Sequence, residues 1–301
     1  MWAAVLLLLG QSSGAWAGGR PPECAEPNGR TSNVWERAKA PELGRYCDLV
    51  ASASSKLAGV AATAPAALTT AQEAQALLPG KAAPLVLEGR ALAALGRFDE
   101  AVAAFSEGAK RDGHTLEDPA ALLAWARALA RTGRLEAAAD AYRSLLPRAA
   151  VLATTSRVSA EIEAGLVAMQ RGERGLDESA AALREAVREA QDEAQAVAAL
   201  ALALALDRAG GSREARALLA ERAHGDPREA LATPRAKDLL AVAPAESHAM
   251  AALALEASDG VAAKEEWQRS IDEAPRGPWV AYANEHLAAL AGKRSGAGAG
   301  R

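Results

Sequence analysis

A pattern of small residues, a polar turn and an aromatic residue recurs along this chain and constrains its fold more than any other feature. In the clearest copy, Gly89 and Leu92 precede the turn at 96–100 (GRFDE), which is followed by Ala101 and then Phe105. Further copies contain Ala126, Leu129, Gly133, Ala138 and Tyr142; Ala203, Leu206, Gly210, Ala215, Leu219 and Pro227; and Ala251, Ala263, Trp267 and Pro275. Because small residues let two helix backbones approach closely, the pattern predicts packed helices joined by short turns.

These residues, in this order, resemble the tetratricopeptide repeat, a helix–turn–helix unit of about 34 residues. The resemblance covers residues 82–277, with copies at 82–115, 119–150, 158–191, 196–229 and 244–277. It implies an all-α fold: a right-handed α-solenoid of helix–turn–helix repeats with a C-terminal capping helix. It also implies a surface that binds another protein, with no catalytic site.

The copies are unevenly spaced, which predicts insertions between them. A regular array would repeat every 34 residues or about that, but the equivalent small residues lie farther apart: Ala101, Ala138, Ser179, Ala215 and Ala263. The turn at 172–175 also carries extra residues. We therefore expect an additional short helix within residues 229–242.

The segments that flank the repeats have their own expected roles. Residues 18–30 are rich in Gly and Pro and are expected to be flexible, and residues 31–81 form an N-terminal helical cap. Within the cap, Pro41 is expected to begin one helix, and a second helix is expected from Thr70 to Leu78. Residues 278–290 are predicted to form a capping helix whose Trp279 and Tyr282 cover the last repeat. Residues 291–301 are predicted to be a disordered tail.

Alanine-rich composition supports thin, closely packed helix pairs. Half of the residues are apolar, but only 4% are aromatic, and alanine combines a small side chain with the highest helix propensity. The formal net charge is -4, from 34 basic and 38 acidic residues that are mixed along the chain. A nucleic-acid-binding protein would show a basic stripe or a high pI, so this class is excluded.

The N-terminus resembles an export signal. The apolar stretch Val5–Leu9 precedes Ala15-Trp16-Ala17, a small-x-small pattern that predicts cleavage before Gly18 and a signal peptide over residues 1–17. The apolar run is far shorter than the roughly 20 residues of a membrane-spanning helix. No Lys or Arg precedes it, so either the free amino group suffices or the true start lies upstream of Met1. A retained structural helix is the alternative. We expect a protein exported to a bacterial periplasm or cell envelope, without a transmembrane segment in the mature chain.

Two cysteines, Cys24 and Cys47, remain after such a cleavage. An even count in an exported protein favours one disulfide. Two free thiols or a redox role are the alternatives, although no C-x-x-C spacing supports a redox role. We expect a structural bond that fixes the first helices.

The sequence contains no recognisable catalytic, metal or cofactor motif. Its four histidines stand singly, outside the H-E-x-x-H spacing of zinc enzymes. There is no G-x-S-x-G nucleophile elbow and no phosphate-binding loop. We therefore expect no enzyme activity, no cofactor and no metal site.

The resemblance implies that the first helix of each pair lines a concave groove that binds a partner. Arg90, Arg127 and Arg131 would form a small basic stripe suited to carboxylates, because a guanidinium group forms bidentate hydrogen bonds with a carboxylate. The alternative is that these arginines are ordinary solvated side chains. The groove candidates are Val86, Arg90, Leu123, Arg127, Arg131, Ile162, Leu166, Gln170, Leu200, Leu204, Asp207, Arg208, His248 and Glu256.

These expectations combine into one functional hypothesis. The chain is a non-catalytic protein–protein interaction scaffold that binds a partner peptide or protein in the groove of its repeat array, where the arginine stripe would suit an acidic partner. The alternative is a structural subunit of an envelope assembly, held through its convex face or its termini. An enzymatic activity within residues 18–81 is a further alternative that the shortage of His and clustered carboxylates disfavours.

Overall fold

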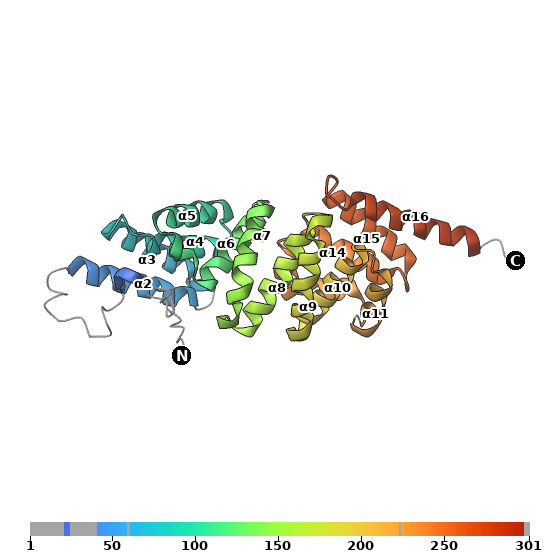
Figure 1. The fold of residues 1–301 in the computed structure, drawn as a ribbon, viewed down its shortest axis with the longest axis horizontal. Coiled ribbons are helices and arrows are strands. Elements are labelled where there is room, and N and C mark those ends of the chain that lie inside the picture. Colours follow the sequence, from blue (N-terminus) through green and yellow to red (C-terminus); the bar gives the residue numbers. More distant parts are fainter. Residues whose placement is uncertain (1–20, 25–40, 59–60, 223, 298–301) are drawn as a thin grey trace, which may run out of the picture. The chain divides into compact units, whose positions relative to one another are not determined.

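The computed structural model describes residues 21–24, 41–58, 61–222 and 224–297 of the 301-residue chain. The predicted signal segment 1–17 lies outside the described residues, as does most of 18–40. The described part of the chain contains fifteen α-helices, several short 3-10 helices and no strand (Figure 1). Consecutive helices pack against each other in pairs. The predicted all-α class and its helix–turn–helix organisation are confirmed.

The chain divides into two compact units, one that ends at Trp125 and one that begins at Ala126. The helices of the first unit are α2 (Pro41–Ala58), α3 (Ala64–Leu77), α4 (Ala83–Ala94) and α5 (Phe98–Arg111), and α6 (Pro119–Arg131) contains the boundary. Pro41 begins α2 as expected. The start of α3 lies earlier than the expected Thr70, because the alanine-rich residues before it favour a helix and Pro65 occupies its first turn.

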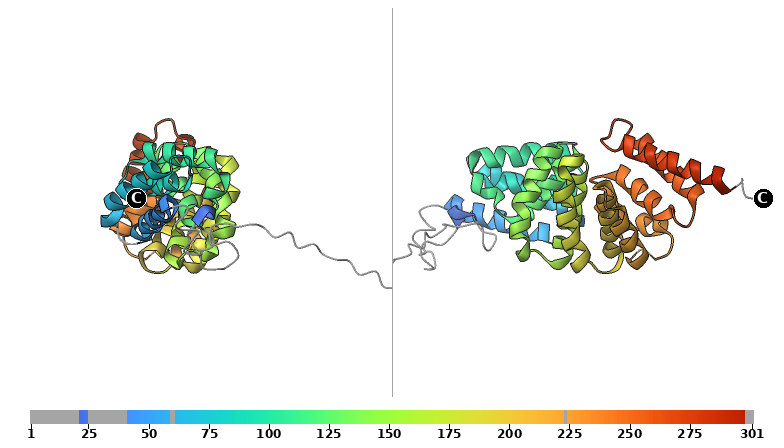
Figure 2. Two further views of the ribbon diagram at one scale, coloured as in Figure 1. Left: turned by 90° about the vertical axis from the view of Figure 1, so that its left-hand side faces the viewer. Right: turned by 45° about the vertical axis from the view of Figure 1, so that its right-hand side comes forward.

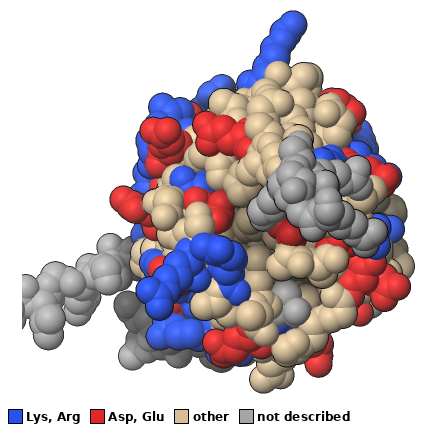
Figure 3. Space-filling model, turned by 90° about the vertical axis from the view of Figure 1, so that its right-hand side faces the viewer, with Lys and Arg blue, Asp and Glu red and all other residues tan. Residues whose placement is uncertain are grey.

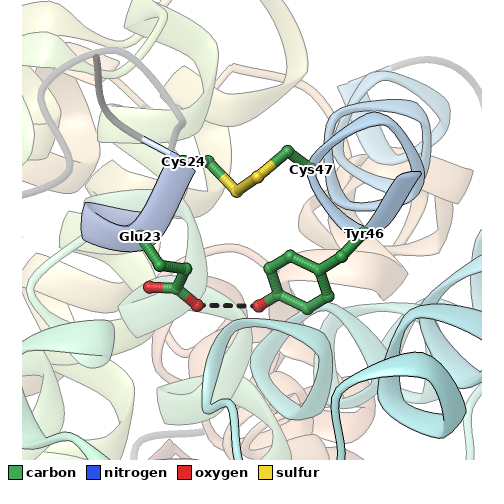
Figure 4. Close-up of a disulfide and its surroundings, with 4 residues drawn as sticks. All are labelled: Glu23, Cys24, Tyr46 and Cys47. Carbon is green, nitrogen blue, oxygen red and sulfur yellow. Dashed lines mark hydrogen bonds between the residues drawn. A yellow bond between two sulfur atoms is a disulfide. The ribbon is translucent and has the colours of Figure 1, made fainter. Parts of the chain in front are cut away.

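A disulfide fixes the N-terminal 3-10 helix η1 (Pro22–Cys24) to α2. Cys24 and Cys47 are bonded, with their Cα atoms 5.6 Å apart, which confirms the predicted pairing (Figure 4). Beside this bond, the Tyr46 hydroxyl donates a hydrogen bond of 2.8 Å to the Glu23 carboxylate. Burial and this carboxylate raise the pKa of Tyr46 far above its ordinary value. The two contacts together hold η1 on the buried face of α2.

The second unit contains the later helix pairs and two short additional helices. Its helices after α6 are α7 (Leu135–Leu145), α8 (Thr154–Met169), α9 (Leu176–Glu189), α10 (Asp192–Arg208), α11 (Ser212–Arg222), α12 (Pro227–Ala232), α13 (Pro234–Leu240), α14 (Pro244–Leu255), α15 (Gly260–Glu273) and α16 (Val280–Ala297). The closest pairs are α8 with α9, α10 with α11, and α14 with α15. These pairs correspond to the third, fourth and fifth predicted repeats.

Glycine turns explain why the predicted loops join two helices so tightly. Gly96, Gly133 and Gly210 each follow a first helix with φ between +72° and +84°, a conformation that costs side-chain-bearing residues energy. In each turn the next N–H donates to the carbonyl five residues earlier, closing a Schellman motif. These bonds are Arg97 to Leu92 (2.9 Å), Arg134 to Leu129 (2.9 Å) and Gly211 to Leu206 (2.8 Å).

Small residues lie where the two helices of a pair meet. A Cβ atom added at Gly89 would lie 2.9 Å from the Phe105 ring, and one added at Gly165 would lie 2.5 Å from Leu183 Cγ. Phe105 and Leu183 are fully buried. The recurring small residues of the sequence are therefore close-contact positions between paired helices.

One insertion and a C-terminal helix distinguish the second unit from a regular repeat array. The segment expected to form one short helix forms two, α12 and α13, because Pro227, Pro234 and Pro244 each begin a new helix. The C-terminal helix α16 lies beside α15 (Figure 2). It continues past the expected end at Leu290 to Ala297, in place of a disordered tail there, since alanine, lysine and arginine favour a helix.

Candidate partner-binding surface

The aliphatic side chains predicted to line the groove are buried. Val86, Leu123, Leu166 and Leu204 are at most 6% exposed, and Ile162 and Leu200 are buried as well. They contribute to helix packing and offer almost no area to a partner in this structure. Their role in binding stays a prediction.

Arg90 and Arg131 occupy different environments. The Arg90 guanidinium lies 3.8 Å from the Asp118 carboxylate and is largely buried. Burial lowers the pKa of Arg90, and the attraction of Asp118 offsets this only in part. Arg131 is exposed at the end of α6. The predicted basic stripe thus contains one surface arginine and one that is largely withdrawn from solvent.

Arg127 belongs to a buried polar cluster between α6, α7 and α8. Its Nε donates to both carboxylate oxygens of Glu163, at 3.0 and 2.8 Å, and the Tyr142 hydroxyl donates to the same carboxylate at 2.9 Å. The Glu163 side chain is 2% exposed. Burial would lower the pKa of Arg127, but the adjacent carboxylate outweighs it and the pKa is raised. Arg127 is therefore already paired with a carboxylate of its own chain.

Gln170 and Arg208 contact the segments that follow the insertion. The Gln170 side-chain amide donates to the Val242 carbonyl at 2.9 Å. Arg208 lies 2.7 Å from Glu246 in an ion pair whose side chains are 2% and 8% exposed. Its guanidinium also stacks 4.5 Å from the centroid of the Trp279 ring. These two predicted groove residues hold α14 and the start of α16 in place.

The inserted helices α12 and α13 lie on the first helices of the pairs in the second unit. Helix α13 packs on α8 and α10, and α12 packs on α10 and α14. Arg235 of α13 donates hydrogen bonds to the Ser159 hydroxyl and, at 3.3 Å, to the Thr155 carbonyl of α8. The insertion therefore covers much of the face on which the resemblance would place a partner.

A pocket lies beside this insertion, between α12, α13, α14 and α15. It has a volume of about 490 Å³. Leu231, Leu240 and Ala251, each at most 7% exposed, form its floor, and the more exposed Ala232, Ala241 and Pro244 supply the apolar surface that is open to a ligand. On α14, the lining residues follow an i, i+3, i+4, i+7 spacing and therefore share one face of the helix. They are Pro244, Ser247, His248 and Ala251. The pocket thus uses the first helix of the fifth pair, and it includes the predicted groove residue His248.

Charged side chains surround this floor. The lining cations are Arg228, Lys237 and Arg269, all exposed. Glu266, which is 4% exposed, accepts from Arg269 at 2.7 Å and from His248 Nδ1 at 2.6 Å. Sequence reasoning missed Arg228 and Lys237 because the repeat pattern gives no register within the insertion, and it missed Arg269 because this residue lies on the second helix of its pair. The three prolines that divide the insertion were the available signal.

A second polar cluster fixes α16. The Tyr282 hydroxyl donates to Asp207 at 2.5 Å, and His286 contacts Asp207 at 3.3 Å and Glu256 at 2.6 Å. The Trp267 indole N–H donates to Glu256 at 2.9 Å. As predicted, Tyr282 covers the last repeat, with its ring edge-on to Trp267.

Opposite pKa shifts accompany this arrangement. Burial disfavours the charged form of His286, but the hydrogen bonds to Asp207 and Glu256 outweigh it and raise its pKa to about 9. Burial would likewise raise the pKa of Asp207, but hydrogen bonds from His286, Tyr282 and Ser212 lower it to about 2. At neutral pH the two side chains therefore form an ion pair that connects α10 to α16.

The described residues contain no group of three or more His, Cys, Asp or Glu side chains that could hold a metal ion. Within the same residues, no helix is both long and apolar enough to cross a membrane. On the face drawn in Figure 3, basic and acidic side chains alternate with uncharged surface. This face thus has no single-sign charge field of the kind that binds nucleic acid.

Comparison with known proteins shows similarity of fold only. No protein-family model and no curated protein matches the chain. Among solved structures it is similar to YrrB, described as a tetratricopeptide-repeat protein with an unusual peptide-binding site, at 16% identity over 71% of this chain and 97% of that chain, with a TM-score of 0.41. It is also similar to TTC0263, a tetratricopeptide-repeat protein of Thermus thermophilus, at 21% identity over 69% of this chain and 98% of that chain, with a TM-score of 0.37. Scores this low carry no argument about function.

Proposed function

We propose that this chain is a non-catalytic scaffold that binds a partner peptide or protein on the first-helix face of its helix pairs. The observation that carries the proposal is the pocket between α12, α13, α14 and α15, where exposed cations surround an apolar floor. Ligand pockets in proteins combine these features: a mostly apolar concavity with a few polar groups that fix orientation.

The surrounding helices supply a rigid support for such a surface. The Schellman turns and the contacts at Gly89 and Gly165 fix the two helices of a pair relative to each other. A surface that is ordered before binding loses less conformational entropy when a partner docks. The ion pairs of the two polar clusters described above link neighbouring helix pairs, so these charged side chains have a structural role.

We further propose export to a bacterial periplasm or cell envelope. The signal-like segment 1–17 supports this assignment. The Cys24–Cys47 bond supports it as well, because disulfides persist in oxidising compartments. Fractionation of cells that express the chain with a C-terminal tag tests the location, and recovery of the tagged chain with Met1 intact in the cytoplasm would contradict it.

Affinity capture tests the scaffold function. The tagged mature chain is incubated with extracts of its native envelope, crosslinked and recovered. The expected result is a defined protein partner that excess untagged chain displaces. Absence of any displaceable partner would contradict the scaffold. A partner bound in fixed stoichiometry that resists displacement would favour a structural subunit of an assembly.

Arg127 is unsuitable for charge reversal in this assay. A carboxylate at position 127 would face the buried Glu163 carboxylate and destabilise the fold, so loss of binding would carry no information. Arg131 is exposed at the end of the same helix. The variant Arg131→Glu is therefore the appropriate probe of the predicted basic stripe.

A further inference from the structure

We infer that the pocket between α12, α13, α14 and α15 binds an acidic peptide segment of the partner, with an aliphatic side chain in the pocket and carboxylates on its cationic rim. This inference rests on the proposed scaffold function and names the chemistry of the partner.

The floor selects an apolar side chain. The apolar surface open to a ligand comes from Ala232 of α12, Ala241, which follows α13, and Pro244 of α14; the buried Leu231, Leu240 and Ala251 also line the pocket. The volume of about 490 Å³ lies within the roughly 300–1,000 Å³ that is usual for ligand sites. Water in contact with these carbons is displaced when an aliphatic group enters, which favours binding in proportion to the area buried.

The rim selects negative charge. Arg228 pairs with Asp226 at 2.6 Å, and Arg269 pairs with Glu266. Within the described residues the Lys237 ammonium has neither a hydrogen-bond nor an ion-pair partner. Of the three lining cations, Lys237 alone is therefore left without a carboxylate of its own chain among the described residues, while Asp226, Glu266 and, beside His248, Glu273 accompany the others. A carboxylate of the partner would complete this set, whereas a basic partner would be repelled.

A protein segment fits better than a nucleic acid. The three cations surround one apolar concavity and do not form a stripe that could follow a phosphate backbone. No Phe, Tyr or Trp side chain lines the pocket, so its one aromatic ring is the His248 imidazole, which is already hydrogen-bonded to Glu266.

Fluorescence anisotropy with labelled peptides tests the inference on the full mature chain. The probes are a short peptide of alternating acidic and leucine residues, the same peptide with lysine in place of the acids, and the same peptide with serine in place of the leucines. A labelled oligothymidine serves as the nucleic-acid probe. The acidic leucine peptide alone should bind, and added salt should weaken it because the rim is exposed.

Two variants place this binding in the pocket. Lys237→Glu should weaken the acidic peptide about fivefold or more, because a rim charge changes from attractive to repulsive. Ala241→Trp should weaken it by filling the cavity. Their controls, Arg213→Glu and Ala220→Trp, change exposed residues of α11 outside the pocket and should leave affinity unchanged.

The outcomes separate this inference from the scaffold function. Three results would overturn the pocket assignment. The first is equal binding of the acidic peptide by Lys237→Glu and Arg213→Glu; the second is binding of the basic peptide or of oligothymidine; the third is no binding by any peptide. If the envelope partner is still captured in that case, the scaffold stands and its binding surface lies elsewhere. Circular dichroism and thermal melting of each variant exclude loss of folding as the cause.

Discussion

The pairing of Arg127 with Glu163 yields the most quantitative prediction. Replacing Arg127 by Met removes the guanidinium that donates to both carboxylate oxygens, while keeping a long aliphatic side chain. Glu163, at 2% side-chain exposure, then keeps the Tyr142 hydroxyl as its one donor among the residues that the structure describes. The variant therefore measures what an unpaired carboxylate costs in the interior of the second unit.

The expected loss of unfolding free energy is about 3 kcal/mol. Breaking a buried ion pair from one side costs roughly 3–5 kcal/mol, and the low end applies because the Arg127 side chain is 34% exposed. Adding Glu163→Met should recover about half of the loss, since no buried charge then remains. A residual loss of about 1–2 kcal/mol is expected because the buried Tyr142 hydroxyl loses its acceptor.

Urea unfolding followed by circular dichroism measures these values. Arg143→Met is the matched control, because Arg143 is 54% exposed and pairs at the surface with Asp140 at 2.8 Å and with Glu178 at 3.5 Å. It should cost no more than about 0.5 kcal/mol. If Arg127→Met cost as little as this control, or if the effects at Arg127 and Glu163 simply added, the pair would not be the buried, coupled contact described here.

Further predictions concern packing, protonation and the disulfide. Gly165→Ala should lower the free energy of unfolding by about 1–3 kcal/mol in urea melts, because its Cβ would overlap Leu183; unchanged stability would disprove close contact there. Protonated His286, with a pKa of about 9 against 6.5 when exposed, should stabilise the fold fully below pH 6.5. This contribution, on the order of 3 kcal/mol, should vanish as the pH rises through 9, and His286→Gln should abolish that part of the pH dependence of urea unfolding. Reduction of the Cys24–Cys47 bond, or Cys24→Ser, should destabilise the first unit by about 3 kcal/mol because the cross-link restricts the unfolded chain; equal melting temperatures for the oxidised and reduced protein would contradict this.

Local signals explain what the sequence could predict. Gly96, Gly133 and Gly210 mark turns because few other residues adopt a positive φ at low cost. Gly89 is small because a Cβ there would meet the Phe105 ring. Both requirements act within one helix pair, so they leave a readable pattern that predicts helix pairs and their approximate boundaries.

The binding surface depends on contacts between distant segments, and the sequence pattern does not encode these. The register of the repeat placed Arg127 on the first-helix face, but gave no indication that Glu163, in the next pair, would occupy its guanidinium. Similarly, the pattern indicated an insertion after residue 229 but not the helices on which it packs. The cations Arg228 and Lys237 became candidates only once α12 and α13 were seen beside α14.

The most direct test of the binding surface is site-specific photocrosslinking in the native envelope. A photoreactive amino acid is placed at Ala232, an exposed residue that lines the pocket, and in a separate variant at Ala220, an exposed residue of α11 outside it. The account predicts a crosslink from Ala232 to the same partner that affinity capture recovers, and none from Ala220. A crosslink from Ala220 alone, or equal crosslinks from both positions, would contradict the account.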